Sequence, residues 1–131
     1  MIYFVLIISM IFCHIVDDYY LQGCLAKMKQ KKWWEENYPD KKYKNDFYVA
    51  LICHSISWSF MIHLPLMIFS LYEQLELTIF FCLSWIMNML VHLKVDHLKA
   101  NELKINLWQD QIIHFAQIVI TFIVFIIVAS S

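Results

Sequence analysis

Histidine and other polar side chains recur four residues apart inside the most apolar stretches of this sequence. The sets are His14, Asp18 and Gln22; His54 with Trp58; Asn88, His92 and Asp96; and Asp110 with His114. Ionisable groups are costly in hydrocarbon, so each one inside a spanning segment marks a candidate functional site. Imidazole and carboxylate together suit zinc, manganese or iron. The residue types and their spacing therefore predict one metal site built from four helices.

The predicted cofactor is a divalent transition metal, zinc first, with manganese or iron as alternatives. Facing helices of a bundle build such sites, and a metal with an open position supplies hydroxide near neutral pH. The candidate ligands are His14, Asp18, His54, His92, Asp96, Asp110 and His114. The candidate catalytic residues, as general base, ligand or orienting group, are Asp18, Asp96 and Asp110. The residues expected to orient these groups or to bind an anionic substrate group are Gln22, Asn88, Lys99 and Gln111.

The composition places these residues in a membrane protein. Hydrophobic residues make up 61% of the 131 residues and charged residues only 16%. Four stretches reach the roughly 20 residues that cross a bilayer, at about 1–21, 47–71, 77–95 and 105–128. We expect a single all-α domain, a bundle of four transmembrane helices. Its first span lacks the basic start and small-residue cleavage site of a signal peptide, so we interpret it as retained.

The lysines predict the topology. Seven lie between the first and second spans, three lie from the end of the third span to the start of the fourth, and arginine is absent. The opposite loop carries only Glu73 and Glu76. The positive-inside rule then puts both lysine-bearing loops in the cytoplasm and both termini outside. Without arginine, the usual residue for reading bases and phosphates, nucleic-acid binding has little support.

This topology brings the polar sets to one depth. Each set lies toward the end of its span that faces the cytoplasm, although only the lysines were used to orient the chain. Residues four apart share one helix face, so each set forms a polar stripe that should turn inward. The predicted site therefore lies in the cytoplasmic leaflet, where it meets a lipid-linked substrate or a soluble phosphate or ester. The corresponding activity is that of a metal-dependent membrane hydrolase.

Other polar residues are expected to have structural roles. We expect His63 to be structural, because it lies toward the outer side, and His97 to be interfacial. Asp17 departs from the stripe of His14 and fits a supporting role behind a ligand. The four cysteines form no CxxC pair and are expected to be small buried hydrophobes. The lysine-rich segment 27–46 should hold a short amphipathic helix, with its tryptophans at the membrane interface.

Non-catalytic interpretations remain open beside hydrolysis. Buried histidine–aspartate pairs can simply join helices through hydrogen bonds, and they can also relay protons or bind a transported ion. A small phage-type membrane effector that acts through oligomers is a further alternative. None of these alternatives needs an open metal position.

The polar sets also carry a family resemblance. The run from His14 through Asp18 and Tyr19 to Gln22 resembles the H-x-x-x-D-[FY]-x-x-Q signature of a small bacterial and phage membrane-protein family, domain of unknown function 3307. In that family a lysine follows the glutamine, a position that Lys27 or Lys29 fills here. The resemblance covers most of the chain and implies an inner-membrane protein with a polar site.

Three further elements of that family have counterparts later in the chain. They are the histidine that opens the second span (His54), the H-x-x-x-D-x-x-K element (His92, Asp96 and Lys99) and the D-Q-x-x-H element (Asp110, Gln111 and His114). His97 replaces an aromatic residue, and the lysine-rich loop is longer than usual. The family name specifies no activity, so the resemblance implies a site and not a reaction. A looser similarity, to membrane-bound metal-dependent hydrolases, concerns the type of site only.

Overall fold

The protein is built from helices. A computed structural model describes residues 1–131 and contains no strand. Four helical stretches are long and apolar enough to cross a membrane, which indicates an integral membrane protein. They are α1 (Ile2–Ile15) continued by the π-helix η1 (Val16–Leu21), α4 (Phe47–Tyr72), α5 (Thr78–Ala100) and α6 (Leu107–Ala129). The all-α class and the four helices of spanning length are thus confirmed.

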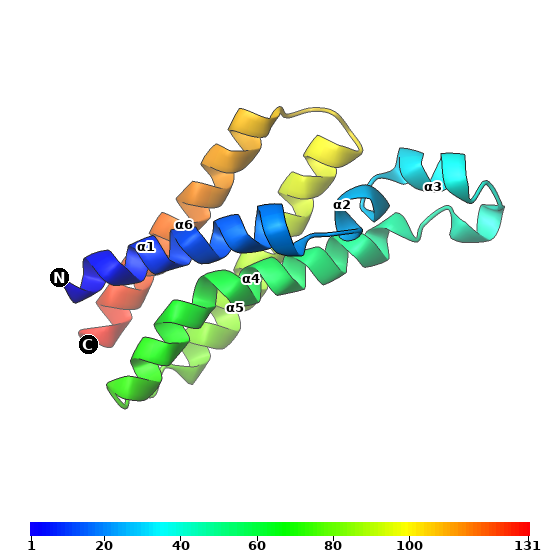
Figure 1. The fold of residues 1–131 in the computed structure, drawn as a ribbon. Coiled ribbons are helices and arrows are strands. Elements are labelled where there is room, and N and C mark those ends of the chain that lie inside the picture. The colour runs from blue at the N-terminus through cyan, green and yellow to red at the C-terminus, as the bar shows by residue number, and fades with distance from the viewer.

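The long helices share one apolar core. α4 packs against α1 and α5, and α6 packs against α5 and α1. Every long helix contributes to this core, whose buried members are Leu6, Met10, Trp58, Ile62, Leu66, Phe80, Ile118 and Phe125. The two termini lie near each other at one end of the molecule, and α2 and α3 lie toward the other end (Figure 1). The core therefore fills the half of the molecule that contains the termini.

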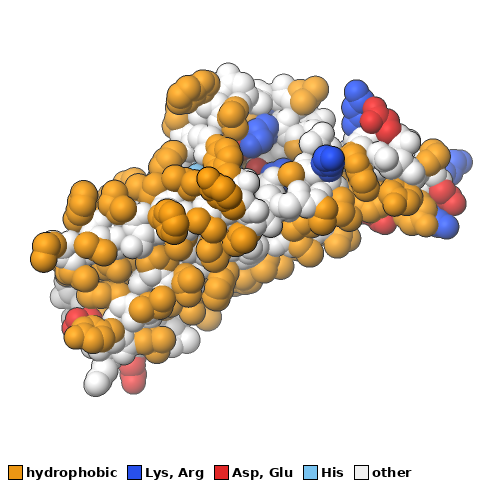
Figure 2. Space-filling view, viewed as in Figure 1, with side chains coloured by type: hydrophobic (Ala, Val, Ile, Leu, Met, Phe, Trp, Pro, Cys, Tyr) orange, Lys and Arg blue, Asp and Glu red, His pale blue; other side chains and the backbone are white.

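The outside of the long helices is covered by apolar side chains, while charged groups gather toward the ends (Figure 2). The prediction that the cysteines are buried was wrong, because Cys24, Cys53 and Cys82 are exposed and Cys13 is partly exposed. Adjacent helix residues point about 100° apart, so Cys53 faces outward where His54 faces inward. Lipid accepts an apolar thiol as readily as a core does, and hydrophobicity alone does not separate the two positions.

The lysine-rich segment contains the short helices α2 (Leu25–Met28) and α3 (Lys31–Asn37) and the 3-10 turn η2 (Lys41–Tyr43). Trp34 holds this segment to the start of α4, where it packs with Phe47 and Leu51. Its indole N–H also donates to the carbonyl of Met28 at 2.6 Å. The expected short helix is therefore present, and Trp34 anchors it by packing.

Two local details differ from the expectation. α5 continues to Ala100 rather than ending near residue 95, and Asp96 within it is buried against the other helices. The first span changes to π-helix geometry from Val16 to Leu21, which no residue pattern predicted. Such π-turns are rare and occur often at functional sites. This one carries both Asp17 and Asp18.

Polar contacts close the link between α5 and α6. The ammonium of Lys104 lies 2.6 Å from a carboxylate oxygen of Glu102, and this contact lowers the pKa of Glu102 below its usual range. Glu102 also lies 3.6 Å from Lys94. These charged groups lie at the exposed end of the two helices.

Because the long helices share one core, shortening a side chain of α4 should lower the free energy of unfolding more at a buried position than at an exposed one. Leu66→Ala should lower the free energy of unfolding by about 2–3 kcal/mol because it leaves a cavity. The loss falls at the lower end of the Leu→Ala range, since detergent or lipid already solvates the separated helices. Ile68 is 59% exposed on the outer face of the same helix, so Ile68→Ala should change the free energy of unfolding by less than about 0.5 kcal/mol. Unfolding in dodecyl sulfate, followed by circular dichroism, measures both, and equal losses would contradict the described core.

Candidate metal centre

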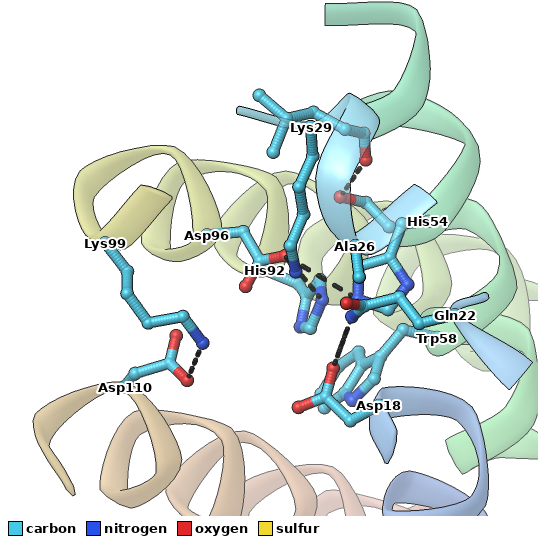
Figure 3. A network of polar contacts seen from close by, with 12 residues as sticks. Asp18, Gln22, Ala26, Lys29, His54, Trp58, His92, Asp96, Lys99 and Asp110 are labelled. Carbon is cyan, nitrogen blue, oxygen red and sulfur yellow. Dashed lines mark hydrogen bonds and ion pairs between the residues drawn. The ribbon is translucent and has the colours of Figure 1, made fainter. Parts of the chain in front are cut away.

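The predicted ligands come from four helical elements and meet in one buried cluster. Asp18 projects from η1, His54 from α4, His92 and Asp96 from α5, and Asp110 and His114 from α6. In Figure 3 the labelled side chains of this group point toward one another from different helices. All but Asp18 are at most 1% exposed, and the side chain of Asp18 is 6% exposed. The polar stripes therefore do turn inward.

The centre of the cluster holds ligand atoms without hydrogen-bond partners. Both ring nitrogens of His92, Oδ1 of Asp96 and Nε2 of His114 are buried and unpartnered. One ligand atom from each of these three residues lies within 4.8 Å of the other two. Buried polar atoms normally have partners, and an orphaned group costs about 1–3 kcal/mol. A cation between these atoms would satisfy them together.

His114 is already oriented for such a role. Its Nδ1 lies 2.8 Å from the backbone carbonyl oxygen of Asp110, so Nδ1 carries the proton and donates it there. The lone pair then resides on Nε2, which lies 3.9 Å from Oδ1 of Asp96. Metal-binding histidines commonly donate their second nitrogen to a carbonyl or carboxylate in this way.

A second group shares His92. One ligand atom each from Asp18, His54 and His92 lies within 4.8 Å of the others. Nε2 of His54 lies 3.1 Å from Oδ1 of Asp18 and 2.8 Å from the amide nitrogen of Gln22. His54 presents its other nitrogen, Nδ1, to a carboxylate oxygen of Asp17 at 3.4 Å. Asp17 in turn accepts a hydrogen bond from the hydroxyl of Ser57.

His14 differs from His92 and His114 because both its ring nitrogens are hydrogen-bonded. The indole N–H of Trp58 donates to Nδ1 at 2.7 Å, and Nε2 donates to Oε1 of Gln111 at 3.1 Å. The amide of Gln111 donates to both Asp18 and Asp110 at 3.1 Å. This arrangement makes His14 and Gln111 a hydrogen-bonded frame around the cluster.

Two lysines reach the cluster from its sides. The ammonium of Lys29 is buried and lies 2.6 Å from Oδ2 of Asp96, while that of Lys99 lies 2.5 Å from Oδ2 of Asp110 (Figure 3). With the carboxylates ionised and the histidines neutral, the four clustered aspartates exceed these two lysines by two negative charges. These aspartates are Asp17, Asp18, Asp96 and Asp110. One divalent cation would balance that excess.

Asn88 lies one turn away and does not join the cluster. Its amide nitrogen donates to the hydroxyl of Thr121 at 2.7 Å, and its side-chain oxygen accepts from Gln117 at 3.0 Å. His63 is bonded to the carbonyl of Ser59 and the hydroxyl of Ser84, away from the cluster, as expected of a structural residue. Asn88 therefore bridges α5 and α6 rather than meeting the candidate ligands.

Lys29 was expected only from the family resemblance, and Ser57 was not predicted to take part in the site. The residue pattern does not distinguish Lys29 from the six other lysines of the lysine-rich segment. Lys29 becomes buried only because the turn after η1 returns the chain to the cluster, where its ammonium meets Asp96. Asn101 fastens that turn: its amide donates to the carbonyl of Lys29 at 3.0 Å and accepts from the backbone N–H of Lys31 at 2.6 Å. Asp17 was recognised only as a supporting residue, and the π-helix places it beside His54.

The fold and the cluster together define a helical membrane protein with a buried histidine–aspartate centre. Comparison with protein-family models, curated proteins and solved structures finds no match to this chain.

Because Lys29 pairs with Asp96 in the interior, removing Lys29 should destabilise the protein more than removing a lysine of an exposed ion pair. Lys29→Met should lower the free energy of unfolding of metal-free protein by about 3 kcal/mol, because it leaves a buried carboxylate unpaired. The double variant Lys29→Met/Asp96→Asn should regain at least half of that loss. Lys32→Met, which removes an exposed pair with Glu36, should cost less than about 1 kcal/mol. Dodecyl sulfate unfolding measures all three, and equal costs for Lys29 and Lys32 would show that Lys29 is not buried against Asp96.

Proposed function

We propose that the cluster binds a divalent transition metal, zinc first and manganese or iron as alternatives. The observation that carries this proposal is the set of facing, buried and unpartnered atoms on His92, Asp96 and His114. These three residues are the first ligands, and Asp18 and His54 extend the set through His92. With all four carboxylates ionised, the cluster carries two more negative than positive charges, which would favour a divalent cation over a simple hydrogen-bonded network. Imidazole and carboxylate ligands in this proportion favour zinc, manganese or iron over magnesium or calcium.

The reaction proposed for this centre is hydrolysis of a lipid-linked or other phosphate or ester substrate. A bound metal with an open position makes water nucleophilic near neutral pH. Asp17 and Asp110 each keep one buried carboxylate oxygen without a partner, Oδ2 of Asp17 and Oδ1 of Asp110. Asp17 lies behind His54, so Asp110 is the proposed general base. Its other oxygen is held by Lys99 and Gln111, which fixes the carboxylate. Lys99 is 26% exposed at the edge of the cluster and can meet an anionic group of the substrate.

His14, Gln22 and Gln111 then act as orienting residues. Gln111 holds two carboxylates at once, and His14 holds Gln111. The resemblance to the domain of unknown function 3307 family supports a common site, since its four motifs supply residues of this one cluster. The looser similarity to membrane-bound metal-dependent hydrolases supports the reaction type only.

The membrane orientation belongs to the same proposal. Seven of the ten lysines lie in the lysine-rich segment, and the other three lie in the last turns of α5 and in the α5–α6 link. The two termini lie at the other end (Figure 1). In a bacterial inner membrane the positive-inside rule then puts the cluster in the cytoplasmic leaflet and the termini outside.

A non-enzymatic role is the second candidate. His14, Gln111 and Asp18 satisfy one another without a metal, as a structural network would. A bundle that conducts ions or protons, or a phage-type effector that acts through oligomers, would use that network to hold its helices together. Such a role leaves the unpartnered atoms of His92 and His114 without explanation, and we therefore prefer the metal centre.

Metal content tests the proposal directly. Protein purified in detergent should carry stoichiometric zinc, manganese or iron by mass spectrometric metal analysis. His92→Ala and His114→Ala should each lower metal affinity at least about tenfold, because each removes an unpartnered ligand atom. His63→Ala is the matched control, since it removes an equally buried histidine that is fully hydrogen-bonded elsewhere.

The outcome against the proposal is equally definite. Absence of stoichiometric metal after reconstitution with each of the three ions, or equal losses in the His92 and His63 variants, would leave the hydrogen-bonded network as the function of the cluster. Growth arrest or dye leakage that persists in the His92→Ala variant would then favour the membrane effector.

The orientation has its own test. In a chain whose four cysteines are replaced by serine, a cysteine at Lys42 should react with an impermeant maleimide only after the cells are opened. A cysteine at Glu73, in the exposed turn between α4 and α5, should react in spheroplasts. The reverse pattern of labelling would place the lysine-rich segment outside.

A further inference from the structure

A groove of about 970 Å³ runs along the outside of the bundle between α5 and α6. Its walls extend from Glu76 and Val128 at the end nearer the termini to Val91 and Ile113. On α5 the lining runs from Thr78 to Val91, a stretch of 14 residues or roughly 21 Å at about 1.5 Å per residue. The volume falls within the range of roughly 300–1,000 Å³ that small-molecule sites occupy. It is a site-sized hollow that the metal centre does not account for.

The groove presents a hydrocarbon surface. Eleven of its 17 lining residues are hydrophobic, including Leu83, Met87 and Ile120, and the only charged one is Glu76 at its far end. The polar side chains in its floor are hydrogen-bonded to one another, since the amide of Asn88 donates to the hydroxyl of Thr121 and accepts from the amide of Gln117. Among these groups Oε1 of Gln117 has no donor. An occupant therefore needs to bring little polarity of its own.

The groove leads to the candidate metal centre. Residues three or four apart share a helix face, so the wall at Asn88 continues inward to His92. On α6 the wall at Gln117 continues to His114, and the wall at Ile113 continues to Asp110. The last lining residues, Val91 and Ile113, each directly precede a proposed ligand. A molecule lying in the groove with its polar end inward would bring that end to within about one turn of the cluster.

The occupant of this groove depends on the membrane around it. Both walls are helices of membrane-spanning length, so the surrounding solvent is lipid hydrocarbon. At the level of Asn88 the side-chain bonds across the floor, at 2.7–3.0 Å, tie α5 to α6. A helix about 10 Å wide therefore cannot enter between them and can only lie over the groove. A single extended chain can lie within it, since its length of roughly 21 Å exceeds half of the approximately 30 Å hydrocarbon core.

We propose that the α5–α6 groove binds the hydrocarbon chain of a membrane lipid whose anionic head group lies at the His92–Asp96–His114 cluster. The role of the head group rests on the proposed function, whereas binding of the chain rests on the groove alone. Lys99, at the edge of the cluster, is the residue that faces the anionic group. The substrate class is thus a long-chain lipid with a phosphate or ester head group, and not a soluble phosphate.

The experiment compares two probes with the same head group. Lysophosphatidic acid with a palmitoyl chain, and glycerol phosphate without a chain, are titrated into the detergent-purified full chain and followed by native mass spectrometry. The palmitoyl probe should bind at least about a hundredfold more tightly, because its chain is buried in the groove. Equal affinities would overturn the proposal in favour of a soluble substrate.

Two variants on one helix locate the chain. Ala116 lines the groove, so Ala116→Phe fills it and should weaken binding of the palmitoyl probe at least about tenfold. Val119 is exposed on α6 outside the groove, so Val119→Phe is the matched control and should leave binding unchanged. Equal effects of the two variants overturn the proposal. A dimer that the Ala116→Phe variant loses would instead make a second copy of the chain the occupant.

Metal removal separates this inference from the proposed function. Protein stripped with a chelator should keep its preference for the palmitoyl probe over glycerol phosphate, because the groove is intact. Loss of all chain-dependent binding on stripping would overturn the groove as an independent site. Failure to find metal with chain-dependent binding retained would contradict the metal centre and leave the lipid groove standing.

Discussion

The architecture of this protein depends on the cost of charge in hydrocarbon. Each long helix carries polar groups that cannot face lipid, and each helix must therefore turn that stripe toward the others. Oppositely charged neighbours satisfy part of the need, as in the contact of Lys29 with Asp96 at 2.6 Å. The remainder is met by amide and indole donors such as Gln111 and Trp58. The packing of the helices and the assembly of the polar cluster are consequently one event.

Trp58 shows how core and cluster are joined. Its ring stacks on His92 with centroids 4.2 Å apart, and its N–H donates to His14. The same fully buried side chain belongs to the apolar core that fills the half of the bundle near the termini. The core therefore fixes the position of the histidines, which lets their unpartnered atoms face one another without collapsing into direct hydrogen bonds. A site held open in this way is suited to an ion, which supplies the missing partner.

The cluster and the α5–α6 groove occupy consecutive turns of the same two helices. Asn88 and Gln117 form the boundary between them, because their mutual hydrogen bonds close the floor of the groove just before the ligands begin. On the opposite side, the segment after η1 covers the cluster and is fastened to the end of α5 by Asn101. The proposed site thus has a polar cover toward the lysine-rich end and the apolar α5–α6 groove on the side toward the bilayer interior. That polarity is what a lipid with an anionic head group requires.

Hydrophobic runs and spacing of four residues were sufficient to determine the all-α class, the four spans and most of the residues that converge, since both signals are local and each helix displays them independently. The C-terminal end of α5, the π-helix at Asp17 and the exposed cysteines were not predictable, because they depend on which neighbour pairs with a charge or covers a thiol. Only the tertiary structure decided that His14 is hydrogen-bonded on both nitrogens while His92 is free on both. The two residues look alike in sequence, each with an aspartate four residues on, and they differ because partners from other helices reach one ring and not the other.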